Sequence, residues 1–179
     1  MSDSPWRPWA SEISTRERPA TALGTFEAQL MGKKSDRLRP EPDREPRTQY
    51  AALPWRRSAD GAVEILLITS RESRRWVIPK GWPMKDRTPE AAAAQEAYEE
   101  AGVVGKPRHK TLGLYHYDKR LRSGRLQHVR VLVYALEVKE ARDIWPEMAE
   151  RDRLWSSPAE AASLVDEPEL RTLLAKFKA

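Results

Sequence analysis

Short apolar runs separated by turn signals predict a β-sheet in the middle of the chain. Residues 63–71 (VEILLITSR) are rich in β-branched residues and predict a buried strand. The Asp60-Gly61 pair before this run signals a tight turn. Residues 74–82 (RRWVIPKGW) predict a short strand that is ended by Pro79 and Gly81.

Two longer segments predict an antiparallel hairpin. They cover residues 109–121 (HKTLGLYHYDKRL) and 125–138 (RLQHVRVLVYALEV), and Ser123-Gly124 lies between them as the turn. The second segment is the more apolar of the two. Residues 151–157 (RDRLWSS) predict one more short strand.

A helix start stands out at Thr88-Pro89-Glu90. Thr is a preferred N-cap, Pro suits the first helical position, and an acidic residue suits the first turn. The helix is expected to continue through residues 91–101. It should end at Gly102, because glycine readily adopts the left-handed conformation that closes a helix.

Two further helices are predicted near the C-terminus. Ser157-Pro158-Ala159-Glu160 has the pattern of a capping box, and residues 168–177 begin with proline. Strands that alternate with helices in this way indicate an α/β (α+β) fold. We expect a mixed sheet with helices packed on it, as an α/β/α sandwich.

The first part of the chain differs from the rest in composition and in hydrophobic periodicity. Residues 1–46 contain many of the 14 prolines, mixed charges and little periodicity, so they predict an extended or partly disordered N-terminal extension. Within and beside it, residues 20–31 predict a short helix and residues 39–48 (RPEPDREPRT) a polar linker. The domain is expected to cover residues 47–179.

Composition excludes several classes of protein. The 179 residues include no cysteine, which excludes disulfide frameworks, thiolate zinc sites and a cysteine nucleophile. No apolar run approaches the roughly 20 residues of a membrane-spanning helix, and the N-terminal residues lack the pattern of a secretory signal. We therefore expect a cytoplasmic protein with no membrane partner.

The formal net charge of +5 is concentrated in the middle of the chain. Residues 50–130 carry 16 Lys and Arg side chains against 9 Asp and Glu. Excess positive charge favours polyanionic partners such as phosphorylated metabolites or nucleic acid.

Three acidic residues lie on one face of the predicted helix. Glu96, Glu99 and Glu100 are spaced i, i+3 and i+4, so they fall within an arc of about 100°. Like charges this close repel one another, and a hard divalent cation such as Mg²⁺, which prefers carboxylate and phosphate oxygens, would offset the repulsion. The opposite face consists of small residues that allow close approach to a sheet. They are Ala93, Ala94, Ala97 and Ala101.

The segment that begins at Gly81 resembles the signature of the Nudix hydrolase family. That signature is a loop–helix–loop written G-x5-E-x7-R-E-U-x-E-E-x-G-U, where U is aliphatic. The matching residues after the glycine are Glu96, Glu99, Glu100, Gly102 and Val103. The family's first Glu falls on Arg87, its Arg falls on Gln95, and Ala97 is a small residue at an aliphatic position. We hypothesise that Arg87 supplies the counter-charge that Gln95 lacks.

The resemblance implies a hydrolase of diphosphates linked to another moiety, with Mg²⁺ or Mn²⁺ as the cofactor. It implies that Glu96 and Glu100 are metal ligands, and that Glu99 is a ligand or the base that activates water. It also implies that a backbone carbonyl within Lys80–Gly81 completes the metal shell.

Residues 47–178 look like the diphosphoinositol polyphosphate phosphohydrolase branch of the family. The similar pieces are Thr69–Arg71, Arg75–Pro79, Glu99–Val103 and Arg151–Trp155. This resemblance implies that polar and cationic side chains hold the substrate phosphates. The matching or nearby candidates are Ser70, Arg71, Arg122, Arg125 and Arg151. Diphosphoinositol polyphosphates and dinucleoside polyphosphates are the expected substrates.

Several alternatives stay open at this point. One is an enzyme that removes diphosphate from RNA 5′ ends, and another is a non-catalytic Nudix-like module that binds nucleotides. Trp82 and Trp145 are each either packing residues or platforms for a nucleobase. Any further metal ligand is undetermined, as is the oligomeric state. The open candidates for that ligand are Glu137, Glu140, Glu147 and Glu150.

Overall fold

A mixed seven-stranded sheet forms the centre of the fold, which was obtained as a computed structural model that describes residues 45–179. The strands are β1 (Arg47–Arg57), β2 (Val63–Thr69), β3 (Trp76–Val77), β4 (Lys80–Gly81), β5 (Val103–Arg120), β6 (Leu126–Ala141) and β7 (Arg153–Ser156). The helices are α2 (Pro89–Ala101), α3 (Pro158–Leu164) and α4 (Pro168–Ala175).

The sheet has the order β3-β2-β1-β6-β5, with β4 paired to β1 and β7 paired to β2. The pairing of β1 with β6 is parallel, from Arg47 opposite Val129 to Trp55 opposite Glu137, and the other pairings are antiparallel. β4 lies next to the first half of β1, where Tyr50 is opposite Gly81. This pairing places the loop before α2 at the centre of the sheet.

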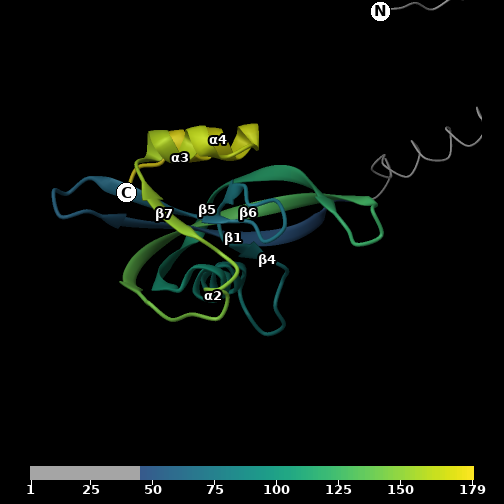
Figure 1. The fold of residues 1–179 in the computed structure, drawn as a ribbon, viewed down its shortest axis with the longest axis horizontal. Coiled ribbons are helices and arrows are strands. Elements are labelled where there is room, and N and C mark those ends of the chain that lie inside the picture. The colour runs from purple at the N-terminus through teal and green to yellow at the C-terminus, as the bar shows by residue number, and fades with distance from the viewer. Residues whose placement is uncertain (1–44) are drawn as a thin grey trace, which may run out of the picture. The chain divides into compact units, whose positions relative to one another are not determined.

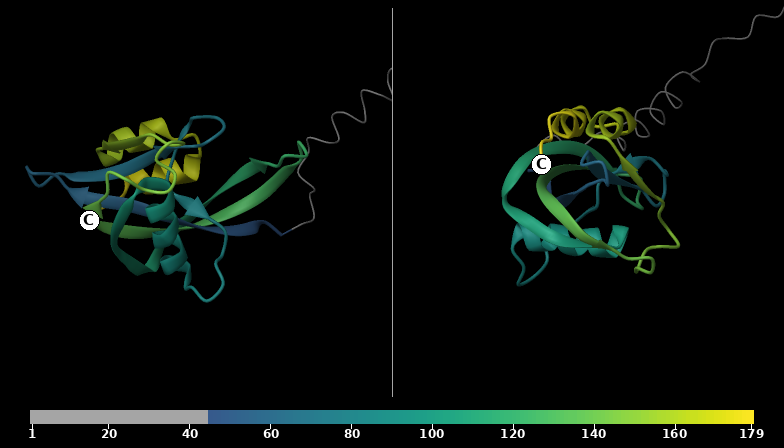
Figure 2. Two further views of the ribbon diagram at one scale, coloured as in Figure 1. Left: turned by 60° about the horizontal axis from the view of Figure 1, so that its bottom comes forward. Right: turned by 90° about the vertical axis from the view of Figure 1, so that its left-hand side faces the viewer.

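Helices cover both faces of the sheet, as Figures 1 and 2 show: α2 lies on one side, and α3 and α4 lie together on the other. The face under α2 packs Leu66, Ile68 and Leu136 against the small residues Ala93 and Ala97. The other face packs larger side chains against α3 and α4. They include Leu53, Ile65 and Leu67, which share a cluster with Leu170 and Leu174 of α4. The predicted α/β/α sandwich is therefore confirmed.

Most of the predicted elements are confirmed by the structure. The helix after Thr88, the 63–71 strand, the long hairpin, the short strand within 151–157 and both C-terminal helices are all present. The hairpin strands are longer than predicted, because β5 begins immediately after α2 at Val103 and β6 continues to Ala141.

The prediction of one strand over residues 74–82 is wrong. The structure has two separate two-residue strands there, because β3 pairs with β2 whereas β4 pairs with β1. Pro79 separates them; its carbonyl accepts a hydrogen bond from Ala52 at 3.0 Å, and proline itself has no N–H to donate to a ladder. β1 is not among the predicted strands, although it is central to the sheet.

The expected extension over residues 1–46 lies outside the described residues except for its last two positions. The predicted helix at 20–31 and most of the predicted linker at 39–48 lie outside them as well. Within residues 45–179, none of the helices is long and apolar enough to cross a membrane.

Candidate metal and diphosphate site

Helix α2 holds the acidic residues on a rigid base. Pro89 occupies its first turn after the N-cap Thr88, and Gly102 ends it in the left-handed conformation with φ of 65°. The backbone N–H of Gly102 donates to the last turn of the helix, at Tyr98. Ala93, Ala97 and the sheet below fix one face of α2, and Glu96 on the acidic face lies against Gly81 at the end of β4.

Gly81 and Glu96 are in close contact. A Cβ atom added at Gly81 would lie 1.8 Å from Oε1 of Glu96, which means that the carboxylate fills the space that any other residue's side chain would occupy. The absence of a side chain at this position therefore lets a carboxylate of α2 lie directly against the backbone of β4.

The Glu96 carboxylate lies among other acids. Burial, and then the negative charges of Glu100, Glu99 and Glu147, raise the pKa of Glu96 to about 7, while Arg151 opposes this effect. The acids predicted to share one face of the helix are thus electrostatically coupled in the folded protein. Glu147, from the loop after β6, joins them.

Glu100 is the most enclosed of these acids. Its Oε2 accepts a hydrogen bond from the backbone N–H of Lys80 at 3.0 Å, and its Oε1 contacts the guanidinium of Arg151. Burial raises the pKa of Glu100, and the positive charges of Lys80 and Arg151 act in the opposite direction. The contact with Lys80 ties the α2 helix to β4 directly beside Gly81.

Glu99 is held by a neutral donor. Nε2 of Gln95 donates to Oε1 of Glu99 at 2.6 Å. The backbone carbonyl of Glu99 accepts a hydrogen bond from the N–H of Glu147 at 3.1 Å, which brings the loop after β6 against the helix. Gln95 therefore orients Glu99 without adding a positive charge.

The residues present fit a hard divalent cation. The donor set consists of carboxylate oxygens beside a backbone turn, which suits Mg²⁺ or Mn²⁺, and the space at Gly81 is kept free of a side chain. In the described part of the chain, no group of three or more His, Cys, Asp or Glu side chains converges on one point as it stands. The acidic side chains do not converge because Glu99 and Glu100 each accept a hydrogen bond from a protein donor, Gln95 and Arg151 respectively.

Comparison with known proteins identifies the family. The NUDIX domain family matches residues 47–177. The chain belongs to the Nudix family. Nudix hydrolase 13, mitochondrial, of Arabidopsis thaliana is 33% identical over 123 residues, which cover 66% of this chain and 61% of that protein. Diphosphoinositol polyphosphate phosphohydrolase 2 of Rattus norvegicus is 33% identical over 125 residues, which cover 69% of this chain and 65% of that protein.

The chain thus spans less than two thirds of the length of either relative. Solved Nudix structures share its fold. A C. elegans Ap4A hydrolase has a TM-score of 0.53 at 20% identity and covers 74% of this chain and 96% of its own. The NUDIX domain of Shewanella oneidensis NrtR, complexed with ADP ribose, has a TM-score of 0.55 at 16% identity and covers 85% and 98%.

The counter-charge expected from Arg87 comes from another residue of this Nudix domain. Arg87 is exposed, and within residues 45–179 it forms no ion pair with the acids of α2. Arg151 is buried and contacts both Glu100 and Glu147, the latter at 2.6 Å. The hypothesis for Arg87 is therefore corrected, because the cation arrives from the segment before β7 rather than from the loop before α2.

All three guanidinium nitrogens of Arg151 donate to protein acceptors. Besides the two acids, its Nη1 donates to the backbone carbonyl of Thr69 at 3.0 Å. As the structure stands, Arg151 holds the acids and the end of β2 together. Its expected contact with substrate phosphates stays a prediction.

Arg71 lies at the rim of the acidic cluster. Its Nη1 is 3.6 Å from Glu147 and 3.7 Å from Glu150, and more than half of the side chain is exposed. Ser70 lies beside it, with its hydroxyl 2.7 Å from that of Ser73. Both predicted phosphate contacts are thus on the end of β2 that faces Glu147.

Arg122 and Arg125 lie elsewhere. They are exposed at the turn between β5 and β6, which projects from the sheet away from α2 in Figures 1 and 2. The structure therefore does not bring these two candidates together with the acids of α2.

Of the acids left open as further metal ligands, Glu147 is the one that the fold brings to α2. Glu137 pairs with Lys139 and Glu140 with Arg142, both on β6 and away from the acidic cluster, and Glu150 is at the exposed rim. Sequence spacing gave no signal that distinguished Glu147 from the others, because its position depends on how the loop after β6 folds back onto α2.

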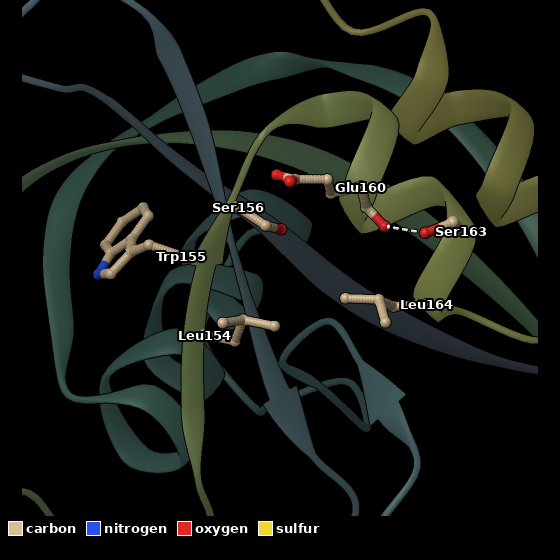
Figure 3. A pocket seen from close by; sticks show the side chains of 6 residues that line it. All are labelled: Leu154, Trp155, Ser156, Glu160, Ser163 and Leu164. Atoms are coloured by element: carbon tan, nitrogen blue, oxygen red, sulfur yellow. Dashed lines mark hydrogen bonds between the residues drawn. The ribbon is translucent and has the colours of Figure 1, made fainter.

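A separate cavity of about 350 Å³ lies between β7 and α3, as Figure 3 shows. Its lining residues are Leu154, Trp155, Ser156, Glu160, Ser163 and Leu164. None of the predicted site residues lines it.

Proposed function

We propose that this Nudix domain hydrolyses diphosphate linkages and that Mg²⁺ or Mn²⁺ is its cofactor. One observation carries the proposal: the Glu96 carboxylate lies against the Gly81 backbone and is coupled by charge to the carboxylates of Glu100, Glu99 and Glu147. A cluster of negative charge in this position repels a diphosphate unless a cation lies between them, and this is the arrangement that metal-assisted phosphoryl hydrolysis requires.

Each acid has a role in this proposal. Glu96 and Glu100, with the backbone at Lys80–Gly81, are the groups that would hold the metal ion. A bound divalent cation supplies charge neutralisation at the phosphates and lowers the pKa of water. Oε1 of Glu99 is occupied by Gln95, which leaves Oε2 to accept the proton of the attacking water.

Arg151 and Gln95 complete the arrangement as positioning residues. Arg151 fixes Glu100 and Glu147 from the side of the sheet, and Gln95 fixes Glu99 from the side of the helix. The catalytic proton acceptor is therefore oriented before a substrate arrives, which reduces the reorganisation that the reaction requires.

Diphosphoinositol polyphosphates and dinucleoside polyphosphates are the proposed substrates. Two similar proteins, a diphosphoinositol polyphosphate phosphohydrolase and an Ap4A hydrolase, support these two classes. The excess of positive charge over residues 50–130 supports an anionic substrate in either case.

The test is a panel of substrates assayed with Mg²⁺ and with Mn²⁺ on the full chain. The panel contains a diphosphoinositol polyphosphate, a dinucleoside polyphosphate and RNA with a 5′-triphosphate, and product release is measured. Glu99→Gln is the matched variant, since it keeps the size of the side chain and removes its basic oxygen. We expect turnover of at least one of the first two substrates and a loss of roughly 100- to 10,000-fold in the variant, the usual contribution of a general base.

Two outcomes would replace this proposal. Turnover restricted to the RNA would identify an RNA 5′ pyrophosphohydrolase. Tight binding without any turnover would identify a non-catalytic module. The hydrogen bonds that Glu99 and Glu100 already make to protein donors, and the departures from the family signature at Arg87 and Gln95, would then explain the lack of turnover.

A further inference from the structure

Glu167 is a buried acid at the start of a helix that it does not cap. It is the N-cap residue of α4, yet its side chain forms no capping hydrogen bond, and only 7% of the residue is exposed. At α3, by contrast, the N-cap Ser157 accepts a hydrogen bond from its own helix in the usual way. The Glu167 carboxylate is therefore directed to another part of the fold.

The partner of Glu167 is Arg75, which is 92 residues away in the chain. Nη1 of Arg75 donates to Oε1 of Glu167 at 2.6 Å and lies 3.6 Å from the exposed Asp166. Only 31% of the Arg75 side chain is exposed. The junction between α3 and α4 thus binds the residue that comes directly before β3.

Arg75 begins a segment, residues 75–81, that ends at the candidate metal site. The segment contains β3 and β4, and its last residue, Gly81, lies against the Glu96 carboxylate. Each of these strands has only two residues, and they pair with different neighbours, β3 with β2 and β4 with β1. The sheet therefore fixes the segment through few hydrogen bonds, and contacts outside the sheet have a large share in its position.

Lys80 connects the two faces of the sheet within this segment. Its backbone N–H donates to Glu100 of α2 at 3.0 Å, and its Nζ is 5.6 Å from the ring of Tyr117, which packs in the cluster that includes α4. Burial lowers the pKa of Lys80, and the negative charges of Glu100 and Glu167 act against this effect. Lys80 is therefore within electrostatic reach of an acid of the candidate site and of the acid at the start of α4.

The pair of Arg75 and Glu167 is not explained by stability alone. Removing two charges from water is costly, and two apolar side chains of similar size would often stabilise a fold as well. Oε2 of Glu167 is also buried and accepts no hydrogen bond from residues 45–179. What the ion pair supplies in addition is a defined position, because a hydrogen-bonded guanidinium has one geometry where an apolar contact has several.

We propose that Glu167 is a positioning residue for the metal site and acts through Arg75. The pair holds residues 75–81 against α4 on one face of the sheet, so that the end of this segment meets the acids of α2 on the other face. The inference rests on the proposed function for the identity of the metal site, whereas the position of the backbone is measurable without a metal.

The test compares Glu167→Gln with Glu64→Gln in the full chain. The first variant keeps an oxygen that can accept from Arg75 and removes the charge. The second removes the charge from an ion pair of similar length, the 2.8 Å contact with Arg56, which joins β1 to β2 instead. Electron paramagnetic resonance measures Mn²⁺ affinity. We expect it to fall by roughly 5- to 30-fold in Glu167→Gln and by less than about twofold in the control.

Amide hydrogen exchange without metal separates positioning from a general loss of stability. Exchange of the Lys80 amide, which donates to Glu100, should become at least ~10-fold faster in Glu167→Gln, while amides in the β5–β6 ladder change much less. Should this variant not fold, Arg75→Lys gives the same comparison, since it keeps the charge but not the fixed geometry of the guanidinium. An equal increase at Lys80 and in the ladder would overturn the inference.

The same measurements distinguish this inference from the proposed function. A protein that binds no Mn²⁺ and cleaves no diphosphate, but shows the selective change at Lys80, would contradict the function and support the positioning of β4 by Glu167. A protein that cleaves diphosphates, with the same Mn²⁺ affinity and the same Lys80 exchange in Glu167→Gln as in the control, would have the function without this positioning residue.

Discussion

Arg151 contacts Glu100 although 51 residues separate them in the chain, and both side chains are buried. The same guanidinium holds Glu147, so one cation balances two acids of the candidate site. A buried carboxylate that loses the cation in direct contact with it is strongly disfavoured. The stability of the fold and the arrangement of the site therefore depend on the same residue.

Replacing Arg151 should test this dependence. Arg151→Met leaves the buried Glu100 without the guanidinium that contacts it, and we expect the free energy of unfolding to fall by about 3–5 kcal/mol in urea without metal. Arg74→Met is the control, because Arg74 pairs with Asp152 at the exposed surface and should cost less than about 1 kcal/mol. Similar losses in the two variants would contradict the assigned role.

The space at Gly81 leads to a second prediction. Gly81→Ala places a Cβ where Glu96 now lies, so the carboxylate must move, and we expect Mn²⁺ affinity to fall by roughly 10- to 100-fold. Gly61→Ala is the control, since nothing lies within 4 Å of a Cβ there. Electron paramagnetic resonance of Mn²⁺ titrated into each variant measures the affinity. Unchanged affinity in Gly81→Ala would remove Glu96 from the metal site.

The end of α2 gives a third prediction. Gly102→Ala combines a φ of +65° with a Cβ only 2.8 Å from the ring of Trp145, so we expect a loss of about 2–4 kcal/mol. Gly124→Ala has a similar positive φ of +81° but open space around it, and should cost only about 1 kcal/mol. The difference between the two unfolding energies measures the contribution of the Trp145 contact.

The raised pKa of Glu96 makes metal binding depend on pH. Because its pKa in the folded protein is about 7, above the ordinary 4.5, this group favours folding below pH 4.5, and that contribution is lost as the pH rises through 7. A cation binds the deprotonated form and offsets the loss. We therefore expect the increase in Tm caused by Mn²⁺ to grow between pH 5.5 and 8.

Glu96→Gln is the matched variant for this pH series. It has no proton to lose in this range, so the Tm increment caused by Mn²⁺ should become small and nearly independent of pH. An increment in the unaltered protein that stays constant from pH 5.5 to 8 would show that Glu96 does not titrate with the metal.

Local signals in the sequence determined a large part of this protein. The sequence predicted the start of α2 at Thr88-Pro89, its end at Gly102 and the spacing of the acids at 96, 99 and 100. These features depend only on residues within one or two helical turns of one another. The long hairpin was predictable for the same reason, since its strands are joined by a short turn. The family resemblance rested on these same local features.

Only the tertiary structure decided what comes together from distant parts of the chain. The central place of β1 follows from its parallel pairing with β6, which no local sequence pattern predicts. The counter-charge comes from Arg151 and the fourth acid from Glu147, because the loop after β6 folds back onto α2. Sequence spacing fixes which side chains share one helix face; it cannot fix which charge from elsewhere is buried against that face, because that choice is made by the packing of the whole sheet.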